Sequence, residues 1–467
     1  MVLADGARAD MVKTLSESGD LPNITRHIIG TGSFLNAVTV LPSVTNVAYL
    51  PMLTGQYPGT ANLPGIRWVD KPLFGPGSVF QTGHRTYVGP SHLLLDRDMP
   101  DDLETLFELC PNSLAVRSDI HRGLSRSRNR FHGVSGPFMF FAHYLKRSAF
   151  IDRIVLNSLF RGLRGADGNF PRFIFLPLID VDTASHGYGP EHRRTIAAYR
   201  RIDGIVGAIV ERLKRIGIWD RTHFLITSDH GHTETTTHLG LGRLLSELDY
   251  KVFEHPQVKR SGADAAVMVS GNSFANIYVT SEGKWQRPLV ADELESEHRR
   301  LLDAVRQRDE IEWTAYRQGD GRVKVVSSSG SALLGKDGER YTYGYEGSDP
   351  LQLGLSSATI HESDALGLTV GTRFPDALEQ LWYLFTSERT GDIVVTSKPG
   401  YDLRSKRELP EHHSSHGALC SAHMIVPILS NRPLSSDRPA RTVDLFCTVI
   451  ESLGLSPTKP HFGHSLW

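Results

Sequence analysis

Short apolar runs alternate with amphipathic stretches along most of the chain. The clearest amphipathic stretch carries an apolar stripe at helical spacing from Ile196 to Leu213, and Gly217 supplies a stop after it. Strands are expected before Asp5 and at 34–42, 172–180, 222–229, 391–397 and 423–431, and helices at 10–18, after residue 43 and at 442–455. This alternation predicts an α/β fold with a parallel sheet covered by helices.

Two segments interrupt the alternation. Residues 110–165 contain a basic stretch at 117–130 and the aromatic-rich "PFMFFAHYL" at 137–145. Residues 250–385 contain hairpin-like strands, a charged helix and a turn-rich region. We interpret both segments as insertions in a single large domain that spans residues 1–467.

The composition narrows the class of protein. Hydrophobic residues make up 40% of the chain, and the formal net charge of -1 gives no global field that favours a nucleic-acid polymer or a membrane surface. The three cysteines are odd in number and widely spaced, which favours buried thiols over a disulfide framework. No apolar run approaches the ~18 residues of a transmembrane segment. The sequence indicates no oligomeric state.

No signal peptide is visible at the N-terminus, so the sequence as given predicts a cytoplasmic protein. However, the first strand reaches Asp5 after only three apolar residues. A true start further upstream, with an export signal, therefore remains an alternative.

Acidic and histidine side chains gather where apolar runs end. Asp5 follows "MVLA", Asp182 follows "FLPLIDV" and Asp229 follows "FLITS". The histidines near these carboxylates, or in "HHSSHGAL" near the C-terminus, are His186, His230 and His416. Ligands of parallel sheets bind at the carboxyl ends of strands, and carboxylates with imidazoles suit zinc and, less specifically, other divalent ions. A strand-end Asp taken alone is more often a helix cap, but the six groups together predict a site for two ions.

Thr45 is the candidate nucleophile. It lies in "LPSVTNVAYLPMLTG", just after a strand and at the expected start of a helix, where free backbone N–H groups favour a phosphoryl anion. A nearby metal ion would lower the pKa of its hydroxyl. Without the metal-binding residues, the preferred reading would be that Ser43 or Thr45 merely caps the helix.

Together these residues resemble the alkaline phosphatase superfamily, particularly its type I phosphodiesterase/nucleotide pyrophosphatase branch. Thr45 stands ten residues before Gly55 of "LTGQYP", as the branch's nucleophile does before its "TG-x-YP" glycine. Asp182 and His186, with "YGP" at 188–190, match "D-x-x-x-H-x-Y-G-P". "SDHGH" at 228–232 matches "SDHGM", and His416 with Gly417 matches a late "S/T-H-G". The matches follow the family's order from residue 5 to residue 417.

The resemblance implies an alkaline-phosphatase-like catalytic domain with a central, mostly parallel sheet sandwiched by helices. It implies that Asp182, His186 and His416 bind one zinc ion and that Asp5, Asp229 and His230 bind the other. Thr45 would attack phosphorus and form a phosphothreonine intermediate. The expected reaction is hydrolysis of a small-molecule phosphate ester, most favourably by a phosphodiesterase or nucleotide pyrophosphatase.

The sequence departs from the branch at two positions near these residues. Thr45 is followed by "NVAY", so Asn46 is the nearby amide and a candidate phosphate contact. His232 stands where the branch more commonly has Met; it is a candidate substrate contact, although a supporting or structural role is favoured. His412 and His413 exceed the expected ligand count and are read as ordinary loop residues.

Other functions of the superfamily stay open. A sulfatase needs C/S-x-P-x-R, which is absent around the three cysteines. A phosphomonoesterase usually adds an arginine near the nucleophile. No arginine is close to Thr45 in the sequence, although folding could bring Arg67 near it. A phosphonate hydrolase, a phospho-head-group transferase and a metal-binding protein without catalysis are the remaining alternatives. The arginines of 117–130 are read as a solvated face or, alternatively, as a surface for anionic substrates or lipid head groups, with "FMFF" at 138–141.

Overall fold

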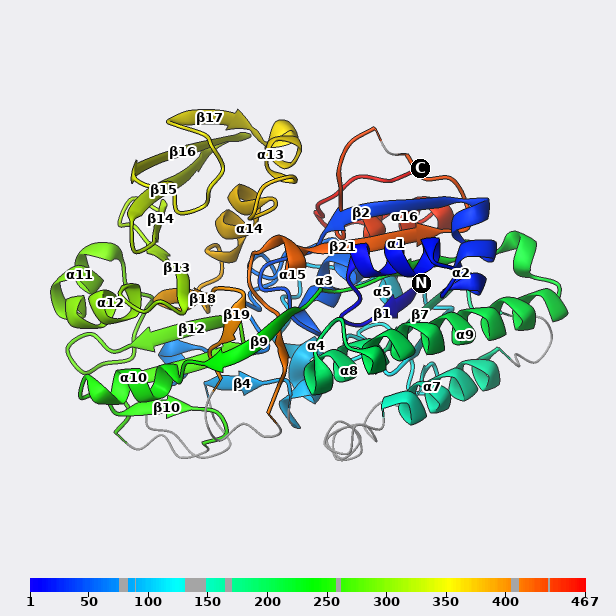
Figure 1. Ribbon diagram of the computed structural model, residues 1–467, viewed down its shortest axis with the longest axis horizontal. Helices are drawn as coiled ribbons and strands as arrows, with labels where there is room; N and C mark the ends of the chain where they lie inside the picture. The colour runs from blue at the N-terminus through cyan, green and yellow to red at the C-terminus, as the bar shows by residue number, and fades with distance from the viewer. Residues whose placement is uncertain are drawn as a thin grey trace.

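The computed structural model describes residues 1–74, 83–88, 90–130, 148–163, 170–257, 262–404, 411–435 and 437–467, so "PFMFFAHYL" at 137–145 lies outside the described residues. An eight-stranded sheet and a nine-stranded sheet lie side by side (Figure 1). The eight strands, in spatial order, are β22 (Ala440–Arg441), β2 (Ser33–Val38), β21 (Ile425–Ser430), β8 (Leu225–Thr227), β1 (Val2–Ala4), β7 (Phe173–Leu178), β5 (Ser113–Val116) and β6 (Asn129–Arg130).

The eight-stranded sheet is mostly parallel. β1 runs parallel to both of its neighbours, β7 and β8, and β5 runs parallel to β7 and β6. β21 is the exception, because it runs antiparallel to β2 and β8. The predicted α/β fold with a mostly parallel central sheet is therefore confirmed.

Helices cover both faces of this sheet. Along β1, Leu3 points into one apolar core while Val2 and Ala4 point into the other, as the two-residue period of a strand requires. The helices on the side of Val2 are α1 (Ala9–Glu17), α2 (Pro22–His27), α7 (Ser148–Gly162), α8 (Asp180–Tyr188) and α9 (Arg193–Arg215). Those on the side of Leu3 are α3 (Leu50–Thr54), α4 (Leu95–Asp98), α5 (Leu106–Leu109) and α16 (Asp444–Leu453). The helix predicted from the stripe between Ile196 and Leu213 is α9, which buries most of that stripe.

The nine-stranded sheet is mostly antiparallel and contains most of the second interrupting segment. Its strands, in spatial order, are β10 (Val252–Glu254), β11 (Ala265–Ser270), β12 (Phe274–Val279), β18 (Ile393–Ser397), β13 (Ile311–Arg317), β14 (Val323–Val326), β15 (Gly330–Asp337), β16 (Arg340–Gly347) and β17 (Ala358–His361). Its helices are α10 (Leu241–Glu247), α11 (Ala291–Glu297), α12 (Arg299–Arg306), α13 (Glu362–Thr369) and α14 (Ala377–Leu384). The grouping of 391–397 with the central strands was wrong, because this run is β18 and pairs with β12 and β13. An apolar run reveals a buried strand but not its neighbours.

A small third sheet runs between the two large ones. It pairs β9 (Thr233–His238) with β19 (Gly400–Asp402) and β20 (Ser414–Ser415), and Figure 1 shows β9 extending from the central sheet toward the second. Because β9 follows β8 directly, it links the carboxyl end of a central strand to segments from near residues 400 and 415. Within the described residues, no helix has the length and apolar character needed to cross a membrane.

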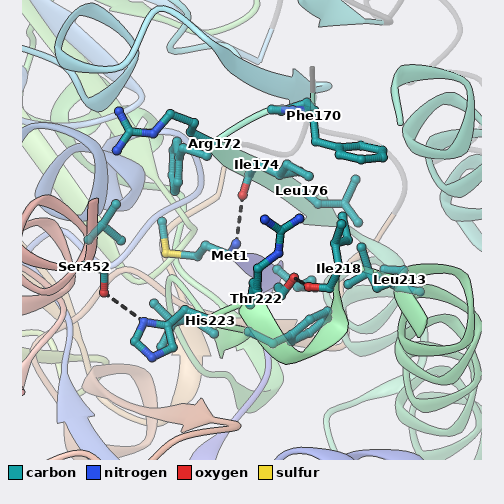
Figure 2. A pocket seen from close by; sticks show the side chains of 18 of the residues that line it. Met1, Phe170, Arg172, Ile174, Leu176, Leu213, Ile218, Thr222, His223 and Ser452 are labelled. Carbon is teal, nitrogen blue, oxygen red and sulfur yellow. Dashed lines mark hydrogen bonds between the residues drawn. The ribbon is translucent and has the colours of Figure 1, made fainter. Parts of the chain in front are cut away.

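A cavity of about 520 Å³ lies at the amino ends of β1, β7 and β8 (Figure 2). Its walls include Met1, whose amino group donates a hydrogen bond to the Ile174 carbonyl over 2.8 Å, and the apolar side chains of Leu213 and Ile218. This cavity is at the opposite edge of the sheet from the predicted metal-binding residues.

One buried carboxylate fixes the start of α8, the helix that carries Asp182 and His186. Asp152 of α7 accepts hydrogen bonds from the backbone N–H groups of Ile179 and Asp180, over 3.0 and 3.1 Å. Burial raises the pKa of Asp152 to about 7, and the charge of Asp180 acts in the same direction. Asp152 thus anchors α8 through backbone groups that would otherwise be buried without an acceptor.

We expect Asp152→Ala to lower the free energy of unfolding by about 2–4 kcal/mol, because two buried N–H groups lose their acceptor. Since the folded pKa of about 7 lies above the unfolded value of 3.8, the part of this carboxyl's contribution to stability that depends on its protonation is complete below about pH 4 and is lost as the pH rises to 7, while the two hydrogen bonds that it accepts remain. The stability of the wild type relative to Asp152→Asn should therefore fall between pH 4 and 7 and then level off. Urea denaturation across this pH range measures it, and a difference that does not change with pH would contradict the assignment.

Candidate active site

The predicted carboxylates meet at the carboxyl ends of three adjacent strands. Asp5 follows β1, Asp229 follows β8, and Asp182 lies in the first turn of α8 after β7. Because β1 lies between β7 and β8, these ends are neighbours in the sheet. Backbone contacts hold them in place: the Asp182 N–H donates to the Asp5 carbonyl over 3.0 Å, and the Gly6 N–H donates to Asp229 Oδ1 over 3.2 Å.

Thr45 lies at the same point. Its Oγ1 is 3.4 Å from Asp5 Oδ1 and 3.2 Å from His230 Nε2. It precedes a short 3-10 helix (Val47–Tyr49) that leads into α3, rather than one long helix. The next residue, Asn46, has a φ of 69°, a backbone conformation that costs free energy for a residue with a Cβ and that asparagine adopts more readily than most residues. Thr45 is half-buried, so its hydroxyl is available to a ligand.

The imidazoles of the site are oriented by backbone carbonyls. The Nδ1 atoms of His186, His230 and His416 lie 3.0, 3.1 and 2.9 Å from carbonyl oxygens. The carbonyls belong to Ser414, Gly231 and Ser43, respectively. A carbonyl can only accept, so each Nδ1 carries the proton and each Nε2 presents its lone pair. This is the arrangement that orients histidines as metal ligands in proteins.

The ligand atoms form three overlapping groups that are each compact enough for a metal ion. The groups are Asp5, Asp229 and His230; Asp182, His230 and His416; and Asp182, His186 and His232, with ligand atoms within 4.8 Å of one another. The first equals one of the sets expected from the resemblance. The other two share Asp182; one pairs it with His186 and adds His232, and the other pairs it with His416 and adds His230.

Unpaired buried atoms show that a cation fits this site. Among the described residues, Asp182 Oδ1, Asp229 Oδ2 and His232 Nε2 are buried without a hydrogen-bond partner. Such atoms are costly unless a ligand satisfies them. Two ligand atoms about 2.0–2.1 Å from a tetrahedral zinc ion are about 3.3 Å apart, and His230 Nε2 is 3.5 Å from both Asp5 Oδ1 and Asp229 Oδ2.

The electrostatics also favour a cation. Burial, followed by the charges of Asp229 and Asp182, raises the pKa of Asp5 well above its usual range. Burial likewise raises the pKa of Asp229 and lowers that of His416 well below its usual value. The His416 imidazole, whose lowered pKa favours its neutral form, and carboxylates that repel one another form a site whose charge a divalent ion would balance.

Several neighbours of the site carried no signal in the sequence. The Tyr49 hydroxyl donates to Asp5 Oδ2 over 3.1 Å. The ring of His412 lies over that of His186, with centroids 4.3 Å apart, and Asn272 Nδ2 is 3.0 Å from His412 Nδ1. The exposed His413 contributes its backbone N–H, which donates to the His186 carbonyl over 2.8 Å.

Two arginines bear on the charge of a bound substrate. Arg67 is buried and donates to the Val269 carbonyl over 3.0 Å. Arg117 lies at the carboxyl end of β5. Burial and the charges of two carboxylates raise the pKa of Asp5, and the positive charge of Arg117 is near enough to oppose this rise. The first residue of the basic stretch therefore lies on the site side of the sheet, which the sequence did not reveal.

Comparisons with solved structures show the same fold. The structure of phosphonoacetate hydrolase from Sinorhizobium meliloti 1021 in complex with phosphonoacetate aligns with a TM-score of 0.57 and 16% identity, over 97% of this chain and 94% of that one. Murine ectonucleotide pyrophosphatase/phosphodiesterase 5 aligns with a TM-score of 0.58 and 14% identity, over 99% and 96%. The expected alkaline-phosphatase-like fold is thereby confirmed.

Sequence comparisons find shorter matches to characterised proteins. Human bis(5'-adenosyl)-triphosphatase ENPP4 is 33% identical over 98 residues, which is 20% of this chain and 20% of the relative. Human ectonucleotide pyrophosphatase/phosphodiesterase family member 1 is 36% identical over 61 residues, which is 13% of this chain and 7% of the relative. The aligned part thus spans about a fifth or less of each relative.

The family assignment rests on a match over most of the chain. Residues 1–419 match the sequence profile described as type I phosphodiesterase / nucleotide pyrophosphatase. This range contains the three strand-end carboxylates, Thr45 and the histidines gathered around them. The chain therefore belongs to the type I phosphodiesterase/nucleotide pyrophosphatase family.

Proposed function

We propose that this protein is a metal-dependent hydrolase of phosphate diesters or nucleotide pyrophosphates that uses Thr45 as its nucleophile. The observation that carries the proposal is the position of Thr45 Oγ1, 3.4 Å from Asp5 Oδ1 and 3.2 Å from His230 Nε2, at the edge of a group of atoms suited to a metal ion. A threonine that only capped a helix would not need to lie beside candidate metal ligands.

The relatives support this activity. Family membership and the partial match to a bis(5'-adenosyl)-triphosphatase agree with cleavage of a phosphate ester or anhydride. An inactive Thr→Ala variant of murine ectonucleotide pyrophosphatase/phosphodiesterase 5 was solved in complex with AMP, which agrees with an essential threonine in that protein.

The residues around Thr45 would hold two divalent ions, with zinc favoured by the mixture of carboxylates and imidazoles. Asp5, Asp229 and His230 would hold one, and Asp182, His186 and His416 the other. When bound, such ions supply positive charge that stabilises the attacking and leaving oxygens and the phosphoryl group between them.

The covalent step belongs to Thr45. A bond forms between Thr45 Oγ and phosphorus while the bond from phosphorus to the leaving oxygen breaks; the hydroxyl proton passes to solvent, and the leaving oxygen takes up a proton from solvent. Water then attacks the phosphothreonine; its oxygen bonds to phosphorus, the Oγ–P bond breaks and the hydroxyl is restored. Asn46, held beside Thr45 with a φ of 69°, is proposed to donate a hydrogen bond to a phosphate oxygen.

Thr45→Ala should lower kcat by several orders of magnitude, because the covalent step is lost while the metal-binding residues remain. Thr45→Ser should keep part of the rate, since the hydroxyl survives without the methyl group that restricts its rotamer. The control is Thr60→Ala, where the half-buried hydroxyl donates to the Tyr57 carbonyl instead. Steady-state kinetics and trapping of phosphothreonine measure the effect; near-normal turnover by Thr45→Ala would mean that water attacks directly.

The purified protein should contain about two divalent ions per chain, and chelation should abolish its activity until the metal is restored. Asp229→Asn should lose about one of these ions, because it removes a buried charge from one ligand group. Metal analysis by mass spectrometry after gel filtration gives the count. A metal-free preparation with full activity is the result that rules the proposal out.

The ratio kcat/KM should be higher for bis-p-nitrophenyl phosphate than for p-nitrophenyl phosphate. A monoester dianion carries one more negative charge, and the buried Arg67 already donates to a backbone carbonyl. Arg117→Gln should widen the diester preference, because losing that positive charge penalises the dianion more. Assays with both esters and a phosphonate ester test this; equal rates on the two phosphate esters, or preference for the phosphonate, would reassign the substrate class.

A further inference from the structure

His232 occupies a position that the proposed ligand sets leave unexplained. It lies three residues after Asp229 and two after His230, and its side chain has no exposed surface. A side chain buried to this degree is poorly placed to contact a substrate. Its Nε2 nevertheless has no hydrogen-bond partner among the described residues. A buried imidazole with one unpaired ring nitrogen needs a ligand on that nitrogen.

The unpaired nitrogen faces Asp182. His232 Nε2 is 3.2 Å from Asp182 Oδ1, and His186 Nε2 is 3.3 Å from the same oxygen. Despite these two nearby nitrogens, Asp182 Oδ1 has no hydrogen-bond partner in the described part of the chain. A direct hydrogen bond from an imidazolium to a carboxylate would be shorter, about 2.7–2.9 Å. The separations instead match the ~3.3 Å between two ligands of a tetrahedral zinc ion.

Ser414 orients both imidazoles. Its carbonyl oxygen accepts from His186 Nδ1 over 3.0 Å, and its Oγ lies 3.1 Å from His232 Nδ1. The two rings stand nearly perpendicular, at 87°, with centroids 4.9 Å apart. Ser414 therefore holds the Nδ1 side of both rings and leaves both Nε2 atoms beside Asp182, which is how supporting residues orient the ligands of a metal ion.

The backbone makes room for the ring of His232. A Cβ on Gly6 would lie 2.6 Å from His232 Nε2 and 3.0 Å from the Cα of Asp182. Gly6 also has a φ of 75°, which favours glycine. The segment after β1 is thus shaped to admit an imidazole next to Asp182.

We infer that His232 is a ligand of the metal ion held by Asp182 and His186. The inference rests on the proposed two-metal site and extends it with a residue that the family pattern does not supply. An additional imidazole makes this position more selective for zinc over oxygen-seeking ions such as Mg²⁺. It also makes the ion at this position harder to remove than the ion beside Thr45.

Three variants separate a ligand from a hydrogen-bond donor. His232→Met fills the space without an imidazole nitrogen, whereas His232→Gln keeps an N–H donor that can reach a carboxylate but is a poor zinc ligand. The matched control is His423→Met, because His423 is equally buried but both of its ring nitrogens have partners, Thr233 Oγ1 and the Ala418 N–H. Circular dichroism of each variant establishes that it is folded before metal is measured.

Zinc affinity of the folded proteins, measured by competition with a chelator, is the first measurement. We expect His232→Met and His232→Gln each to weaken one of the two zinc ions by about 100-fold or more, and His423→Met to change neither by more than a few-fold. Retention of affinity in His232→Gln would overturn the inference, because it would show that an N–H donor is sufficient.

A crystal structure of the zinc-loaded wild type, with anomalous scattering to locate the metal, tests without any variant whether His232 is a zinc ligand. The expected result is a zinc ion about 2.0–2.1 Å from His232 Nε2. Zinc bound to Asp182 but more than about 3 Å from His232 Nε2 would overturn the inference and leave the proposed function intact. Zinc bound to His232 in a protein without phosphoesterase activity would support the inference and overturn the proposed function.

Discussion

Mutual repulsion among carboxylates in a largely buried space is the constraint on which this site depends. Asp5 and Asp229 are buried and Asp182 is 15% exposed, yet the charges of Asp182 and Asp229 both act on Asp5. Removing such charges from water is unfavourable unless a cation or a set of donors compensates for it. The parallel strands β8, β1 and β7 nevertheless bring all three to one place, so the fold keeps an arrangement that becomes favourable when a cation binds.

The second sheet helps to hold this arrangement, so it is more than an insertion at the surface. The His416 N–H donates to the Gly271 carbonyl over 2.8 Å, and the Ser273 N–H donates to the His416 carbonyl over 2.9 Å. Gly271 and Ser273 lie in the turn between β11 and β12. A Cβ on Gly271 would lie 2.7 Å from His416 Nδ1, so the turn passes directly against the imidazole. The turn between β11 and β12 of the second sheet therefore positions His416 at the candidate site, which lies at the carboxyl ends of strands of the first sheet.

Contacts with the backbone also explain why the imidazole rings of the histidines are oriented. Each residue whose carbonyl accepts from an Nδ1 has a backbone that pairs with another segment: Ser414 with β9, Ser43 with Gly417 and Gly231 with His423. Asp152 does the same for α8 through the N–H groups of Ile179 and Asp180. Preorganisation of this kind lowers the cost of binding a metal ion, because the ligands need not be ordered when it arrives.

The sequence by itself determined the parts of this protein that depend on neighbours in the chain. Apolar runs ending in Asp5 and Asp229, and the four-residue spacing of Asp182 and His186, follow from the periods of strands and helices, so the α/β fold and the candidate site residues could be predicted. The pairing of β18, the approach of Arg117 to Asp5 and the place of His232 beside Asp182 could not be predicted. Each depends on which distant segments pack together, and local patterns of apolar and polar residues do not encode that choice. Only the tertiary structure decided it, because burial and backbone pairing between segments that are distant in the chain fix these distances.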